Sequence, residues 1–210
     1  PGVMSVEARG TPLSPDAFIG VGEDNGLIEQ VDWLMYRRVL EWMAANPGPG
    51  YVSINVSPSH FRSDDFAGRL LDLVDVTGAD PQRLRIEITE VALLDDAPRA
   101  LRTMNRLREH GVLALLDDFG TGFSALSYLH RFPISGLKID RSFVAGLDED
   151  GGRQESLALV RAILALAGTL GIETVGEGVE TDAQRDTLLE LGCNCGQGFL
   201  LGRPAARRLS

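Results

Sequence analysis

Short runs in which apolar and polar residues alternate recur along the chain, and longer amphipathic segments separate them. A period of two is typical of strands that bury one face, and a period near 3.6 is typical of helices. The strand-like runs are YVSINVS (51–57), LRIEITE (84–90), VLALLDD (112–118), GLKID (136–140), IETVGEGVE (172–180) and CGQGFLLG (195–202). The intervening segments predict helices at 27–45, 61–76, 97–110, 124–132, 155–170 and 182–191.

This alternation predicts an α/β fold. Strands joined by helices of this length pair in parallel through right-handed crossovers, and six or more such units favour a closed barrel over an open sheet. We therefore expect a modified (β/α)8 TIM-like barrel. Six runs are clear and VMSVEAR (3–9) is a weaker seventh, whereas a closed barrel needs eight strands. We expect the N-terminal strand or strands to be missing from this chain, which would expose pairing edges.

Composition is consistent with one globular domain over residues 1–210, because 44% of the residues are hydrophobic and can bury a core. No apolar run approaches the ~20 residues of a membrane span, and the first residues lack the pattern of a signal peptide. We therefore expect a cytoplasmic location. The net charge of −10 argues against binding a nucleic acid polymer. An anionic ligand would need a metal ion or local cations.

Polar side chains occupy late positions in successive predicted strands. Asn55, Glu87 and Asp117 stand about 30 residues apart, which is about one βα unit each. In a barrel, the apolar residues of each strand pack under the outer helices, so these side chains should point toward the axis at the C-terminal mouth, where barrel active sites lie. Later strands place three further polar residues at similar positions: Lys138, Glu177 and Gln197.

The converging groups predict a site of hard oxygen ligands. Carboxylates and an Asn, without His or Cys, are typical of Mg²⁺ or Mn²⁺ sites. A divalent ion would also offset the repulsion between Asp117 and Asp118. Two alternatives stay open: the paired Asp residues can be a loop cap or a helix N-terminal charge pair, and Lys138 can be a structural ion-pair partner of Asp140 or Glu177.

We assign no chemistry to the histidines or the cysteines. His60, His110 and His130 stand in helical or loop contexts, where surface or packing roles are the simpler interpretation. Cys193 and Cys195 have no second Cys pair and no nearby His, which argues against a zinc site. We interpret them as reduced core thiols.

Six motifs in order, NVS, EITE, DDFGTGFSAL, LKIDRSFV, GEGVE and QGFLLGRP, resemble the EAL-domain family of bacterial cyclic-di-GMP phosphodiesterases. The resemblance runs from about LSPDAFIGVGEDNGLI (13–28) to the C-terminus. It implies a modified (β/α)8 barrel that uses Mg²⁺ or Mn²⁺ to hydrolyse one phosphodiester of cyclic di-GMP, giving linear pGpG. It also implies sensor or GGDEF domains in the parent protein, either a cytoplasmic protein or a membrane-anchored sensor, and a homodimer formed through residues 119–132.

The resemblance also implies roles for the polar residues at the strand ends. Asn55, Glu87 and Asp117 would be metal ligands, and Asp118 would hold a second metal ion. These four positions match the family's motifs residue by residue.

Four further residues would assist the metal site. Lys138 would orient water or offset charge, Glu177 would support the metal site, and Gln197 would help to position water or substrate. Glu90 would brace the loop over 119–128, which in the family links the metal site to the dimer interface.

The family's name motif, Glu-Ala-Leu followed by Leu-Arg, is not seen in this chain. Its Glu would be a metal ligand and its Arg would contact substrate phosphate, but the corresponding place reads PGVMSVEARGTPLSP. Residues 1–3 could stand where the motif belongs, the motif could lie upstream, or EAR (7–9) could be the motif after a local deletion.

Three functions are therefore compatible with the sequence. The first is an active, metal-dependent cyclic-di-GMP phosphodiesterase. The second is a catalytically weak or inactive EAL domain that acts as a cyclic-di-GMP receptor. The third is a different Mg²⁺ barrel enzyme in which Lys138 is the base toward a carbon acid, as in enolase-like sites.

Overall fold

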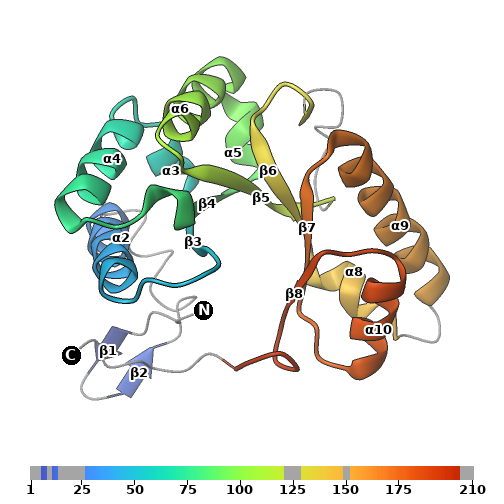
Figure 1. Cartoon of the computed structure of the whole chain (residues 1–210). Coiled ribbons are helices and arrows are strands. Elements are labelled where there is room, and N and C mark those ends of the chain that lie inside the picture. The colour runs from blue at the N-terminus through green and yellow to red at the C-terminus, as the bar shows by residue number, and fades with distance from the viewer. Residues whose placement is uncertain (1–5, 9–10, 14–26, 121–128, 149–151, 204–210) are drawn as a thin grey trace.

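Six parallel strands form a curled half-barrel with helices around its outer face (Figure 1). The computed structural model describes residues 6–8, 11–13, 27–120, 129–148 and 152–203. The strands follow one another in the sheet in chain order, as expected for successive βα units. They are β3 (Val52–Asn55), β4 (Leu84–Thr89), β5 (Leu113–Phe119), β6 (Ile134–Ile139), β7 (Glu173–Glu177) and β8 (Cys195–Gln197). The prediction of an α/β, TIM-like barrel fold is confirmed.

The helices connect these strands and cover the sheet (Figure 1). They are α2 (Leu27–Ala45), α3 (Pro58–Phe61), α4 (Phe66–Thr77), the 3-10 turn η1 (Pro81–Arg83), α5 (Glu90–Asp95), α6 (Ala97–Glu109), α8 (Arg141–Ala145), α9 (Arg153–Leu170) and α10 (Asp182–Glu190). Among the helices of these described residues, none combines the length and apolar character needed to cross a bilayer.

The structure differs from the predicted helices in three places. The helix predicted at 61–76 begins later, as α4 at Phe66, and a separate short helix, α3, precedes it. Helix α3 starts at Pro58 because the Ser57 side chain accepts a hydrogen bond from the His60 N–H and proline suits the first turn. Helices α5 and α8 were not predicted, since five or six residues are too few to show a helical period. The helix predicted at 124–132 falls mostly outside the described residues.

The core lies between the strands and the helices. Ile54 on β3, Ile86 and Ile88 on β4, and Leu137 and Ile139 on β6 are all buried. They occupy alternate positions of their strands, so the residues between them point to the other face, toward the inside of the curl. Burial of each such side chain contributes about 1.5–3 kcal/mol relative to exposure, which fixes which face of each strand is turned inward.

The N-terminal strand-like run (3–9) does not join the six-stranded sheet as a barrel strand would. Residues Val6–Ala8 form β1, which pairs antiparallel with β2 (Thr11–Leu13) in a separate two-stranded sheet. Glu7, one of the candidates for the missing motif, lies in this hairpin. Among the described strands, β3 and β8 each pair on one side only and form the two edges of the half-barrel.

Candidate metal centre

Lys138 stands at the centre of an acidic cluster on the inner face of the half-barrel. Its Nζ lies 2.7 Å from Glu87 Oε2, 2.9 Å from Asp117 Oδ1 and 2.6 Å from Glu177 Oε1. The three carboxylates come from β4, β5 and β7, and the lysine comes from β6. The alternative in which Lys138 is an ion-pair partner is therefore realised with Glu177, whereas Asp140 instead caps α8 by accepting from the Ser142 N–H.

The surroundings of Lys138 keep its ammonium charged. Burial lowers the pKa of this lysine, but the carboxylates of Glu87, Asp117 and Glu177 raise it by more, so the pKa lies above its ordinary value. A lysine that acts as a general base must lose its proton near the working pH, which requires a lowered pKa. The site therefore disfavours an enzyme in which Lys138 abstracts a proton from a carbon acid.

Asp117 and Asp118 present their carboxylates to the same place, which an ordinary strand would prevent because consecutive side chains point to opposite faces. The pairing of β5 with β6 is irregular between Leu116 and Phe119, and Asp118 has a left-handed backbone with φ of 52°. An irregularity of this kind redirects side chains locally. As a result, Asp117, Asp118 and Glu177 each offer a carboxylate oxygen within 4.8 Å of one another.

The surroundings of two of these carboxylates, Asp118 and Glu177, disfavour their negative charge. Burial raises the pKa of Asp118, and the neighbouring Asp117 and Asp140 raise it further. Burial also raises the pKa of Glu177, although Lys138 opposes this effect. Converging carboxylate oxygens are the ligands that Mg²⁺ and Mn²⁺ favour. The donor set therefore fits a divalent cation, which would stabilise the charged forms that burial and neighbouring carboxylates disfavour.

The two amide residues of the predicted site lie on either side of this cluster. Asn55 is the last residue of β3 and pairs in register with Glu87, and Gln197 is the last residue of β8 and pairs in register with Glu177. Both side chains are exposed. Each of the six parallel strands thus contributes a predicted site residue at or near its C-terminal end.

Glu90 is a buried acidic residue that follows β4. It is the first residue of α5, directly after β4, and only 5% of its surface is exposed. Residues 121–128, which the resemblance places in the loop braced by Glu90, lie outside the described part of the chain. The bracing role and the dimer contact through 119–132 therefore stay predictions.

Sequence reasoning missed a polar network next to Asn55. His60, which we had assigned to a surface or packing role, is buried and contacts the polar side chains of Tyr36 and Asp32. Asp32 and Tyr36 are four positions apart on α2, so they share one helix face, and this spacing is the signal that could have been noticed.

The prediction that both cysteines are core residues is wrong for Cys195, whose side chain is exposed.

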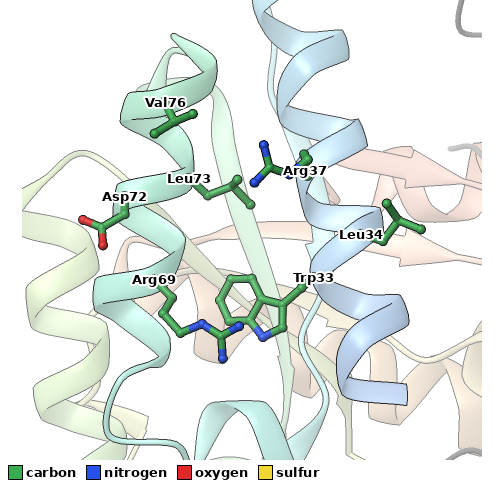
Figure 2. A pocket seen from close by; sticks show the side chains of 7 residues that line it. All are labelled: Trp33, Leu34, Arg37, Arg69, Asp72, Leu73 and Val76. Atoms are coloured by element: carbon green, nitrogen blue, oxygen red, sulfur yellow. The ribbon is translucent and has the colours of Figure 1, made fainter. Parts of the chain in front are cut away.

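A pocket of about 350 Å³ lies between α2 and α4 (Figure 2). Its lining comes from these two helices: Trp33, Leu34, Arg37, Arg69, Asp72, Leu73 and Val76. Arg69 stacks over the Trp33 ring at 4.2 Å from the ring centroid. This pocket is separate from the acidic cluster.

Known proteins share both the sequence and the fold. The EAL domain family model matches residues 4–204. The uncharacterized protein y4lL of Sinorhizobium fredii is 43% identical over 195 residues, which cover 91% of this chain and 23% of that protein. The bifunctional diguanylate cyclase/cyclic di-GMP phosphodiesterase MucR of Pseudomonas aeruginosa is 38% identical over 196 residues, which cover 91% of this chain and 28% of MucR.

A solved structure shows the same arrangement. The PaMucR phosphodiesterase in its c-di-GMP complex superposes with a TM-score of 0.85 and 37% identity, covering 94% of this chain and 81% of that chain. The acidic cluster stands at the carboxyl ends of the parallel strands, which is the face where barrels of this kind carry their sites. This chain belongs to the EAL domain family. It spans about a quarter of the length of the two curated relatives.

Proposed function

We propose that this chain is the phosphodiesterase domain of a signalling protein and hydrolyses cyclic di-GMP to linear pGpG. The observation that carries the proposal is the trio of carboxylates Asp117, Asp118 and Glu177, whose oxygens lie within 4.8 Å of one another. The names of MucR and of the PaMucR complex, which include cyclic di-GMP, support the choice of substrate.

The acidic cluster is the proposed cation site. Asp117, Asp118 and Glu177 would hold the cation, together with Glu87 on β4 and Asn55 on β3 as further ligands. A divalent cation bound there supplies Lewis acidity, which lowers the pKa of water and offsets negative charge on the phosphodiester. We propose Mg²⁺ or Mn²⁺ because the donors are oxygen atoms.

The remaining residues act on charge and orientation. The ammonium of Lys138 stays protonated and attracts Glu87, Asp117 and Glu177 toward one point. Because its ion pairs with Glu87, Asp117 and Glu177 all involve acids, Lys138 limits the repulsion among the carboxylates before substrate arrives. We propose that Gln197, exposed at the end of β8, donates a hydrogen bond to a phosphate oxygen or a water.

The context of the domain is also a proposal. We infer that residues 1–210 form a single EAL domain beside sensor or GGDEF domains in a cytoplasmic protein or in the cytoplasmic part of a membrane-anchored sensor. The double activity in the name of MucR supports this inference. We further propose a homodimer through residues 119–132.

A direct assay tests the function. The chain is incubated with cyclic di-GMP and Mg²⁺ or Mn²⁺, and the products are separated by chromatography. Formation of pGpG that stops on chelation and resumes when the cation is restored is the expected result. Cyclic di-GMP that binds but stays intact would indicate a receptor instead of an enzyme. A chain that neither binds nor hydrolyses cyclic di-GMP would contradict both the enzyme and the receptor.

A further inference from the structure

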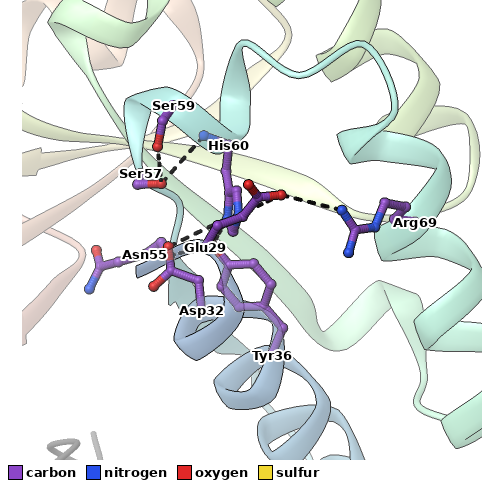
Figure 3. A network of polar contacts seen from close by, with 8 residues as sticks. All are labelled: Glu29, Asp32, Tyr36, Asn55, Ser57, Ser59, His60 and Arg69. Atoms are coloured by element: carbon purple, nitrogen blue, oxygen red, sulfur yellow. Dashed lines mark hydrogen bonds and ion pairs between the residues drawn. The ribbon is translucent and has the colours of Figure 1, made fainter. Parts of the chain in front are cut away.

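A row of buried polar groups lies next to Asn55, between α2 and α3 (Figure 3). The hydroxyl of Tyr36, a fully buried residue of α2, lies 3.2 Å from the main-chain oxygen of Asn55 and 3.3 Å from His60 Nδ1. Asp32 Oδ2 lies 3.4 Å from the same His60 nitrogen. Three elements, α2, α3 and the end of β3, therefore meet at one tyrosine hydroxyl.

The direction of the hydrogen bonds follows from what each group can donate. A carbonyl oxygen only accepts, so the single proton of the Tyr36 hydroxyl goes to Asn55. The Tyr36 oxygen then accepts from His60, which requires the proton of the neutral imidazole to be on Nδ1. Burial lowers the pKa of His60, which favours this neutral form. The chain of donors runs from His60 through Tyr36 to Asn55.

This chain holds one side of the peptide that joins Asn55 to Val56. The carbonyl of that peptide accepts from Tyr36, and its N–H, on Val56, donates to the Glu87 main-chain oxygen at 2.9 Å. The peptide plane is thus held by α2 at one edge and by β4 at the other. Among the described strands, β3 pairs with β4 alone. Tyr36 therefore supplies the hydrogen-bond donor to the Asn55 carbonyl that a second neighbouring strand would otherwise provide.

Ring packing alone does not explain why residue 36 is a tyrosine with a buried hydroxyl. The rings of Trp33, Tyr36, His60 and Phe66 pack together, with centroids 5.3 Å apart for Trp33 and Tyr36. A phenylalanine would make the same ring contacts without the cost of burying a polar group. In Figure 3 the Asn55 side chain points away from this network, so the peptide plane that Tyr36 holds sets where that side chain is aimed.

We propose that Tyr36, oriented by His60, is a positioning residue that fixes the Asn55–Val56 peptide and so aims the Asn55 side chain at the metal centre. This inference rests on the proposed function, because it takes Asn55 to be a ligand of the cation. Tyr36 and His60 act through Asn55 and do not themselves contact the cation.

The test is a titration of the whole chain with Mn²⁺, in which electron paramagnetic resonance measures the free ion and no turnover is needed. Tyr36→Phe keeps the ring and removes the hydroxyl, and we expect about three- to tenfold weaker Mn²⁺ binding, the effect of losing one hydrogen bond. Tyr51→Phe is the matched control, because it removes the same hydroxyl group at the N-terminal end of β3, whereas Asn55 is at the C-terminal end. Its Mn²⁺ affinity should equal that of the parent.

Two variants of His60 test the same link from its other end. His60→Asn keeps a side-chain N–H that can donate to Tyr36, and His60→Leu does not. We expect His60→Leu to weaken Mn²⁺ binding as Tyr36→Phe does, and His60→Asn to restore most of the affinity. Phe66→Leu loosens the same ring cluster without removing a hydrogen bond, so it should lower the thermal midpoint and leave Mn²⁺ affinity unchanged.

The outcomes separate this inference from the proposed function. If the parent binds Mn²⁺, Asn55→Ala weakens binding and Tyr36→Phe does not, positioning by Tyr36 is wrong and the metal centre stands. If affinity follows the thermal midpoint across all variants, Phe66→Leu included, Tyr36 is only structural. A parent that binds no Mn²⁺, or an Asn55→Ala variant with parental affinity, overturns the ligand role on which the inference rests. Should Tyr36→Phe fail to fold, the two His60 variants decide the question.

Discussion

Lys138 Nζ lies 2.7 Å from Glu87 Oε2, although 51 positions separate the two residues in the chain. Their strands, β6 and β4, are not neighbours, because β5 lies between them in the sheet. Adjacent strands are about 4.8 Å apart, so the contact spans roughly two strand spacings. A long lysine side chain and the curl of the half-barrel together close this gap.

Replacing Lys138 by Met should destabilise the protein when no divalent cation is present. The substitution leaves Glu87, Asp117 and Glu177 facing one another without the ammonium that contacts all three. Breaking a buried ion pair by removing one partner costs about 3–5 kcal/mol of unfolding free energy. Urea unfolding checks this loss, and added Mg²⁺ should restore part of it.

The surface variant Arg102→Met is the control for Lys138→Met, since Arg102 is exposed on α6. It should leave the unfolding free energy within about 0.5 kcal/mol of the parent value. A Lys138→Met protein as stable as the parent without cations would contradict the account of the acidic cluster.

Asp117→Asn and Glu87→Gln should both weaken cation binding and slow the formation of pGpG, by roughly a thousandfold or more if each carboxylate contacts the cation. Each change keeps the shape of the side chain and removes one negative charge. Product chromatography gives the rate, and calorimetric titration with Mn²⁺ gives the affinity. Asp75→Asn, at an exposed position of α4, is the matched control. Parental rate and affinity in Glu87→Gln would show that Glu87 serves Lys138 alone.

Asp118→Asn should change stability and cation affinity in opposite directions. Asn tolerates the left-handed backbone that Asp118 adopts, so the fold is kept. Burial and the neighbouring Asp117 raise the pKa of Asp118, which means that the folded protein disfavours its charge. Removing the charge should therefore raise the thermal midpoint without cations and lower the affinity for Mn²⁺. A fall in both quantities would indicate that Asp118 has a structural role instead.

Asp32 should make stability depend on pH. Burial raises its pKa to about 6, against a hydrogen bond from Ser57 that lowers it, and nearby Glu29 raises it further. Because this pKa exceeds the unfolded value of 3.8, the folded state binds the proton more tightly. The contribution of Asp32 to the unfolding free energy is therefore full below about pH 4 and is lost as the pH rises through about 6.

Asp32→Asn should remove this dependence, because an amide of nearly the same shape does not titrate in this pH range. Relative to the parent, we expect the variant to gain about 1–3 kcal/mol of unfolding free energy between pH 4 and pH 7. Urea unfolding at several pH values measures the difference, and Asp72→Asn, exposed on α4, is the control. An equal difference between variant and parent at every pH would mean that Asp32 does not titrate in this range.

The sequence alone determined the fold class and which residues stand at the strand ends. Alternation in runs such as LRIEITE is a local property of the chain, and it placed Ile86 and Ile88 in the core and Glu87 on the opposite face. The matched spacing of Asn55, Glu87 and Asp117 likewise indicated that their strands end at one level. These features follow from the period of the backbone, which neighbouring residues set.

Only the tertiary structure decided how the side chains meet. The irregular pairing at β5 that turns Asp117 and Asp118 to one place arises from contact with β6 and leaves no mark in the period of the sequence. The contact of Lys138 with Glu87 depends on the curl of the sheet, and the bond from Tyr36 to Asn55 depends on how α2 packs against β3. The physical reason is that periodicity records which face of a strand or helix is buried, whereas atoms on residues tens of positions apart are brought within hydrogen-bond distance only by packing.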